Sequence, residues 1–120
     1  MSRFEKVDGQ TWREFVSAPT AVLVLGKTTC PACQAFTTEL EQLLDTDGAA
    51  WPHVRFGKMA LDEGGLIEFK RASPWLADVD VLPFTQIYRA GERWKDFAGG
   101  GVERLRSRLD RLPPPTSAGS

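Results

Sequence analysis

AVLVLGKTTCPACQAFTTELEQLL, residues 21–44, is the stretch that decides the fold. Its first five residues, Ala21–Leu25, form an apolar run that is typical of a buried strand. After a short turn, apolar residues recur every three or four positions, which predicts an amphipathic helix over about residues 31–48. The two cysteines of the sequence, Cys30 and Cys33, therefore lie where a strand passes into a helix.

This position favours reactive cysteines. The first turn of a helix has unpaired N–H groups and a partial positive charge, which lower the pKa of a thiol placed there. Pro31 suits the first helical position because its missing N–H would have no partner there anyway. Cys33 follows Cys30 after about one helical turn. We interpret Cys30 as the exposed, attacking thiol and Cys33 as the resolving thiol.

Other uses of the two cysteines fit the sequence less well. A structural zinc site needs about four nitrogen or sulfur ligands, and the chain offers Cys30, Cys33 and a single histidine, His53. A purely structural disulfide across so short a loop would remove little entropy from the unfolded chain. Redox chemistry, which needs no metal or organic cofactor, is the favoured prediction. A dithiol that handles metal would instead bind a soft metal ion when reduced.

Size and composition point to one domain. The chain has 120 residues, 42% hydrophobic and 26% charged, and its formal net charge of −1 does not favour nucleic acid or an anionic membrane as a partner. No apolar run approaches the roughly 20 residues that span a bilayer. The N-terminal sequence lacks the pattern of a secretory signal, so we expect a cytoplasmic protein. We also expect it to be a monomer. A lone C-x-x-C motif in that compartment is more often catalytic than structural.

The remaining segments alternate between predicted strands and helices. The order β-α-β-α-β-α-β-β-α predicts an α/β fold with a mixed sheet covered on both faces. A tail rich in proline, serine and glycine, residues 113–120, is predicted to be disordered, which leaves a domain over residues 1–112. Further predicted strands span 3–7, 54–61, 84–89 and 92–97, and predicted helices span 9–17 with Asp8 as N-cap, 66–72 with one more turn at 75–77, and 102–112.

With these elements in order, residues 4–112 resemble the thioredoxin superfamily. The resemblance rests on the strand before the cysteines, the Cys30-Pro31-Ala32-Cys33 motif, Lys58 with Asp62, and Val81-Leu82-Pro83 before the final hairpin. It implies the thioredoxin fold, a central mixed β-sheet flanked by helices on both faces. It also implies that the chain is a thiol–disulfide oxidoreductase acting on protein disulfides, with thioredoxin reductase or glutathione as the upstream reductant.

The resemblance assigns roles to individual residues. Cys30 attacks a disulfide and Cys33 resolves the mixed disulfide. Pro83 is expected to be cis and to pack beside the cysteine pair, and Leu82 to offer its backbone to a substrate strand. The candidate site thus consists of Cys30 and Cys33 as catalytic residues, of Thr29, Pro31, Ala32, Leu82, Pro83 and Lys58 as supporting residues, and of no metal ligand.

The sequence also departs from thioredoxins. Thr29 occupies the position of the usual tryptophan, and Pro31-Ala32 separates the cysteines, which predicts a less reducing couple. Val24 replaces the family's buried acid, so Lys58 loses its usual partner. Lys58 then either favours a nearby thiolate or pairs with Asp62.

Two other functions stay open. A glutathione-dependent, glutaredoxin-like reductase would use Val81-Leu82-Pro83 and the Gly99-Gly100-Gly101 turn, both of which match the glutaredoxin pattern in part. In a thioredoxin-fold binding module the cysteines would be vestigial or regulatory, and the surface would recruit a partner. Residues 62–82 are longer than in thioredoxins, and we expect Trp75 within them to pack rather than to bind substrate.

Overall fold

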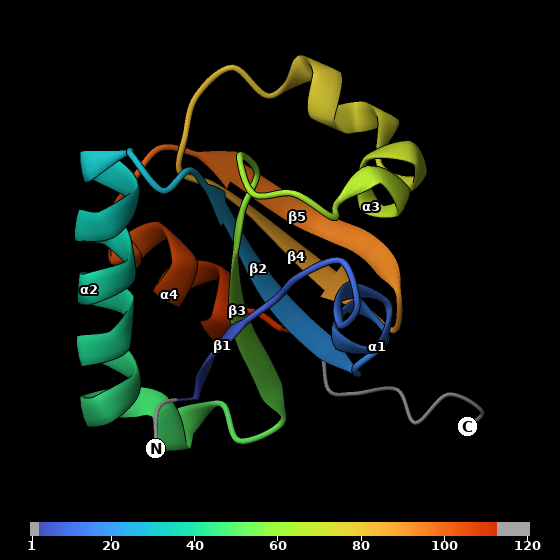
Figure 1. Cartoon of the computed structure of the whole chain (residues 1–120). Coiled ribbons are helices and arrows are strands. Elements are labelled where there is room, and N and C mark those ends of the chain that lie inside the picture. The colour runs from blue at the N-terminus through green and yellow to red at the C-terminus, as the bar shows by residue number, and fades with distance from the viewer. Residues whose placement is uncertain (1–2, 113–120) are drawn as a thin grey trace.

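The computed structural model describes residues 3–112, which form one sheet with helices on both sides (Figure 1). The strand order is β1-β3-β2-β4-β5. The first three strands along the chain are parallel, and the closing hairpin adds two antiparallel strands. The predicted mixed α/β sheet is therefore confirmed. The strands are β1 (Phe4–Lys6), β2 (Thr20–Gly26), β3 (Val54–Ala60), β4 (Phe84–Arg89) and β5 (Glu92–Ala98).

The helices divide between the two faces of the sheet (Figure 1). On one face lie α2 (Pro31–Asp47) and α4 (Val102–Asp110), and on the other lie α1 (Trp12–Val16) and α3 (Ile67–Ala72). Two short 3-10 turns follow α2 and α3, η1 (Gly48–Ala50) and η2 (Pro74–Asp78). No helix within residues 3–112 is long and apolar enough to cross a membrane. The tail predicted to be disordered, residues 113–120, lies outside the described residues.

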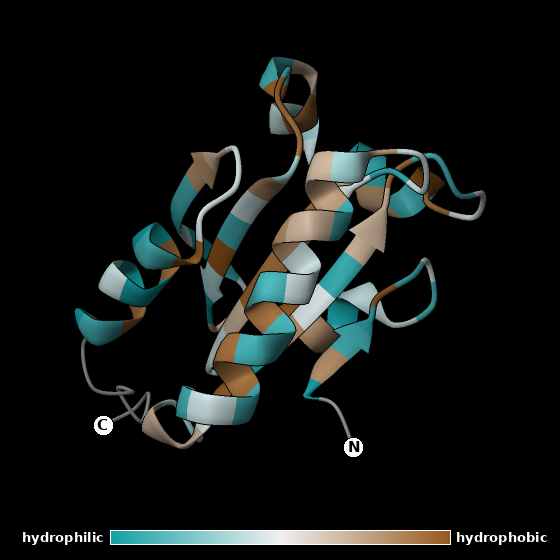
Figure 2. Cartoon of the chain, turned by 90° about the vertical axis from the view of Figure 1, so that its left-hand side faces the viewer, coloured by the Kyte–Doolittle hydropathy of each residue, from teal (hydrophilic) through white to brown (hydrophobic). Residues whose placement is uncertain are grey.

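Two hydrophobic cores explain why β2 is apolar at every position from 21 to 25. Successive side chains of a strand point to opposite faces. Val22 and Val24 pack with α2 and α4, whereas Ala21, Leu23 and Leu25 pack with α1 and α3. In Figure 2, where α2 crosses in front of the sheet, hydrophobic and hydrophilic residues alternate along this helix as an amphipathic pattern requires.

Helix α1 is shorter than predicted, and its predicted N-cap is wrong. The carboxylate of Asp8 accepts hydrogen bonds from the backbone N–H groups of Gln10 (2.9 Å) and Thr11 (3.1 Å). These bonds close a turn ahead of the helix, and the N-cap is Thr11. The backbone N–H of Gln10 in particular holds the pKa of Asp8 below its usual value. Short polar side chains often stabilise such turns in competition with helix.

Ile67 differs from the other apolar residues of the helical segment predicted over residues 66–72. It follows the buried Leu66. Its side chain is instead 65% exposed, whereas Leu66 and Phe69 are buried. In α3, Phe69 therefore faces the core and Ile67 faces solvent.

We expect Gly57→Ala to destabilise the fold by about 1–3 kcal/mol, the usual cost of overpacking a core. A Cβ at this buried β3 position would lie 2.5 Å from Val7 Cγ2 and 2.8 Å from the Phe15 ring. Gly64→Ala is the matched control, because a Cβ there meets no atom within 4 Å. Urea unfolding of both oxidised variants tests the prediction, which equal midpoints would contradict.

Candidate active site

The two cysteines lie at the N-terminal end of α2, in the first turn of the helix. Cys30 is the N-cap, with extended backbone angles of φ −99° and ψ 106°, and Pro31 occupies the first helical position. Cys30 and Cys33 form a disulfide with a Cα–Cα separation of 5.2 Å. The backbone N–H of Cys33 also donates to the Cys30 sulfur at 3.2 Å. A helix N-terminus thus directs a hydrogen-bond donor at the sulfur expected to attack.

The two cysteines differ in exposure. Cys33 is buried, with 5% of its surface exposed, whereas Cys30 is half-buried and is flanked by the exposed residues Thr29, Pro31 and Ala32. Gly26 makes room for the buried partner, because a Cβ at this position would come within 3.0 Å of Cys33 Sγ. Cys30 is therefore the more exposed of the two cysteines.

The segment before β4 lies beside the N-terminal end of α2 in both Figure 1 and Figure 2. The Leu82–Pro83 peptide bond in this segment is cis, as the resemblance implies. Pro83 is buried, and its carbonyl accepts from the backbone N–H of Gly99 at 2.8 Å. Leu82 is half-buried and Val81 is exposed. These elements bring Leu82 and Pro83 to the same end of the sheet as the cysteines.

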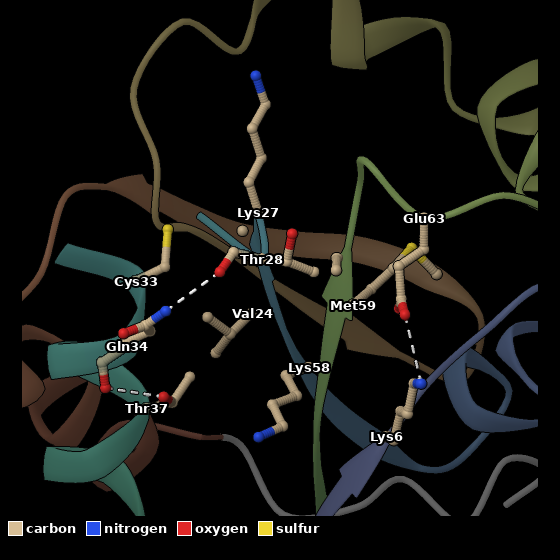
Figure 3. A pocket seen from close by; sticks show the side chains of 12 residues that line it. Lys6, Val24, Lys27, Thr28, Cys33, Gln34, Thr37, Lys58, Met59 and Glu63 are labelled. Atoms are coloured by element: carbon tan, nitrogen blue, oxygen red, sulfur yellow. Dashed lines mark hydrogen bonds and ion pairs between the residues drawn. The ribbon is translucent and has the colours of Figure 1, made fainter. Parts of the chain in front are cut away.

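A pocket of about 390 Å³ opens behind Cys33 on the α2 side of the sheet (Figure 3). Val24, in the position of the family's buried acid, contributes an apolar side chain that is only 1% exposed. Lys58 lies next to Val24 in the parallel register of β2 and β3 and is exposed. The pocket is lined by Lys6, Val24, Gly26, Lys27, Thr28, Cys33, Gln34, Thr37, Lys58, Met59, Ala60 and Glu63.

Lys58 does not pair with Asp62, so that alternative is wrong. Its ammonium group lies 5.6 Å from the centre of the Phe4 ring, and no ion pair joins Lys58 to an acid within residues 3–112. Lys6 and Glu63 form a separate pair at 3.4 Å on the side of the pocket opposite Cys33 (Figure 3). Lys58 is thus a positive charge in the lining of the pocket that also contains Cys33.

Asp62 instead binds the loop that precedes Cys30. Its carboxylate accepts hydrogen bonds from the backbone N–H of Thr28 at 3.0 Å and from the Thr28 hydroxyl at 2.6 Å. The Thr28 hydroxyl, followed by its backbone N–H, holds the pKa of Asp62 below its usual value. The side-chain amide of Gln34 donates to the Thr28 carbonyl at 3.1 Å from the other side. Sequence reasoning missed Thr28 and Gln34, because no local spacing links residue 28 to residue 62.

The other residues considered from the sequence are either exposed or in contact with neighbouring side chains. His53 is exposed. Trp75 packs on the Phe84 ring with centroids 5.9 Å apart, as expected, and the Arg93 guanidinium lies 4.2 Å from the Trp75 ring. Arg104 donates to the carbonyls of Ala98 and Gly100, which ties the glycine turn to α4. Within the described residues, no three potential metal-ligating side chains lie together.

Solved thioredoxins share this architecture. Thioredoxin f2 of Chlamydomonas reinhardtii superposes with a TM-score of 0.72 at 21% identity, over 94% of this chain and 99% of that one. The chain has the thioredoxin fold. The oxidised thioredoxin O2 of Arabidopsis thaliana (0.71, 23% identity, 92% and 95% covered) and the Malassezia sympodialis thioredoxin Mala s 13 (0.73, 14% identity, 92% and 91% covered) also share this thioredoxin fold.

Comparisons of the amino-acid sequence with known proteins do not extend this result beyond the fold. No protein-family model matches the chain. One curated protein, the bifunctional trehalose-6-phosphate synthase/phosphatase of Thermoproteus tenax, is 36% identical over 63 residues. That match spans 52% of this chain but 8% of the other protein. The activity of this chain therefore has to be argued from its own residues.

Proposed function

We propose that the protein is a thiol–disulfide oxidoreductase that reduces protein disulfides. The observation that carries this proposal is the unequal exposure of the two cysteines, with Cys30 accessible at the N-cap of α2 and Cys33 buried one turn later. The helix N-terminus and the Cys33 N–H favour the thiolate form of Cys30. A thiolate is the form that attacks a disulfide.

The reaction proceeds in two exchanges. The Cys30 thiolate attacks one sulfur of a substrate disulfide, which forms a mixed disulfide and releases the other substrate sulfur as a thiolate. Cys33, after losing its proton, attacks Cys30 Sγ and forms the Cys30–Cys33 disulfide, and the second substrate thiolate leaves. Two electrons have then passed from the dithiol to the substrate. Thioredoxin reductase or glutathione would restore the dithiol, in a reducing compartment such as the cytoplasm.

The substrate-facing surface would consist of residues around these sulfurs. Thr29, Pro31 and Ala32 are exposed on the helix side, and Val81 and Leu82 lie on the loop that contains the cis bond. An extended substrate segment could hydrogen-bond to the backbone of Leu82 while its disulfide faces Cys30. Lys58 lines the same pocket as Cys33, and its positive charge would favour the thiolate of this resolving cysteine.

The test is the reduction potential of the Cys30–Cys33 couple, measured in glutathione redox buffers. We expect a value less negative than about −270 mV but within the reductase range, to about −220 mV. A value above about −150 mV would identify a disulfide donor and contradict the reductase. Absence of exchange, with a Cys30 pKa near the free-thiol value of about 8.5, would favour a binding module instead.

A further inference from the structure

The loop between β2 and α2 is held on two sides. Asp62 accepts both the backbone N–H and the hydroxyl of Thr28, and Gln34 donates to the carbonyl of the same residue. All three polar groups of Thr28 are therefore engaged, although the residue is exposed. An exposed threonine needs no protein partners because water can satisfy it. Three such bonds indicate that the loop between β2 and α2 is held in one conformation.

The Asp62 end of this contact is anchored to the sheet. Gly26 and Ala60 are register partners at the ends of β2 and β3, and the Leu61 N–H donates to the Gly26 carbonyl at 2.8 Å. The Glu63 N–H donates back to the Ala60 carbonyl at 3.1 Å. Asp62 therefore lies in a turn whose backbone is bonded on both sides, and its carboxylate is a fixed acceptor.

The Thr28 end of the contact is close to the reactive sulfur along the chain. Thr28 precedes Cys30 by two residues, and the Cys30 N–H donates to the Lys27 carbonyl at 3.2 Å, which closes a tight turn around Thr28. The Cys30 sulfur meets the Cys33 N–H only with Cys30 in the N-cap position. A shift of Thr28 would turn Cys30 away from that N–H.

We infer that Asp62 is a positioning residue for Cys30, acting through Thr28. This inference rests on the proposed function and gives Asp62 a role, through Thr28, that the sequence pattern did not indicate. Its chemical effect is to hold Cys30 Sγ against the Cys33 N–H, which stabilises the thiolate. The Asp62 carboxylate acts by accepting the hydrogen bonds that hold Thr28 in place. Its negative charge by itself would disfavour a thiolate nearby.

The experiment measures the alkylation rate of Cys30 by iodoacetamide as a function of pH, in a Cys33→Ser background with a single thiol. We expect Asp62→Ala and Thr28→Val to raise the pKa of Cys30 and to slow alkylation at pH 6 by about three- to tenfold, because less thiolate is present at that pH. The double variant should be no slower than Asp62→Ala, since Asp62→Ala already removes the hydroxyl hydrogen bond that Thr28→Val removes. Asp62→Asn, which keeps an acceptor but not the charge, should not slow the reaction.

The matched control comes from the residue next to Asp62. Glu63→Gln removes a charge of the same turn, and within residues 3–112 the Glu63 carboxylate pairs with Lys6 and not with Thr28. This variant should not change the alkylation profile. Independent, additive effects of Thr28→Val and Asp62→Ala, or an unchanged Cys30 pKa in Asp62→Ala, would overturn the inference.

The same data separate this inference from the proposed function. Alkylation requires no disulfide substrate and no reductant. If Asp62→Ala raises the Cys30 pKa while the wild-type protein reduces no disulfide, the positioning role stands and the reductase fails. If the wild-type Cys30 pKa is depressed and Asp62→Ala leaves it unchanged, the reductase is unaffected and the positioning role fails.

Discussion

Cys30→Ser is expected to abolish the reduction of a model protein disulfide, with a fall in rate constant of at least about 10³-fold, the scale on which loss of a nucleophile acts in other enzymes. A serine hydroxyl at the α2 N-cap can still accept the Cys33 N–H, so the fold should be unchanged. It cannot form a disulfide bond. Cys33 is not expected to substitute for it, because this residue is only 5% exposed. The measurement is the initial rate of disulfide reduction at neutral pH, with circular dichroism as the control for folding.

Cys33→Ser should stop the reaction at a different stage. Cys30 still attacks, but no second thiol lies within reach to release the substrate, so a mixed disulfide accumulates. Acid quenching, alkylation and mass spectrometry should find an adduct of the protein with the whole substrate, and the double variant should give none. An adduct on Cys33 in the Cys30→Ser protein, with none in Cys33→Ser, would reverse the assigned roles.

The position of the cysteines could be predicted because it depends on local sequence. A continuous apolar run before the motif indicates a strand buried on both faces, and Pro31 with the later helical periodicity fixes where α2 begins. Both signals act over fewer than 20 residues. The order of strands and helices then predicted the mixed sheet. The apolar run Ala21–Leu25 predicted that helices cover both of its faces, and β2 packs against helices on both sides.

The contacts of Lys58 and Asp62 could not be predicted in the same way. The two residues are four apart, and a continuous strand would place both on one face. β3 ends at Ala60, however, and the following turn carries Asp62 toward Thr28 while Lys58 stays in the pocket behind Cys33. The end of a strand depends on its neighbours, here on the register of Gly26 with Ala60. Asp8 was misassigned for a different, local reason, since its carboxylate closes a turn with Gln10 and Thr11 ahead of the helix.

Val24→Asp is the second variant for which we expect a large effect, a loss of stability of about 3 kcal/mol or more at pH 8. The change buries a carboxyl group in place of an apolar side chain that is 1% exposed. Two neighbours reduce the cost. Lys58 is the register partner on β3, and Thr85, the register partner on β4, has a buried hydroxyl without a hydrogen-bond partner in the described part of the chain.

The loss should depend on pH with a defined sign. Burial raises the pKa of the introduced carboxyl group above its unfolded value of about 3.9. The unfolded chain then releases the proton first as pH rises, so the penalty grows from about pH 4 until the folded-state pKa is passed and is constant above it. Urea unfolding at several pH values between 4 and 8 measures this course. A penalty independent of pH would mean that the carboxyl group is not buried.

Val22→Asp is the matched control that isolates the pocket. Val22 lies two residues earlier on the same face of β2, fully buried, and its register partners are Phe56 and Ile87, which offer no charge or hydroxyl. We expect this variant to lose more stability than Val24→Asp, and Lys58→Met to deepen the loss only in Val24→Asp. A carboxylate tolerated beside Cys33 could also take the proton of the resolving thiol, so release of the mixed disulfide should be faster in Val24→Asp. If both variants lose equal stability and Lys58→Met has no effect on either, Lys58 does not stabilise negative charge in this pocket, and its proposed action on the Cys33 thiolate is wrong.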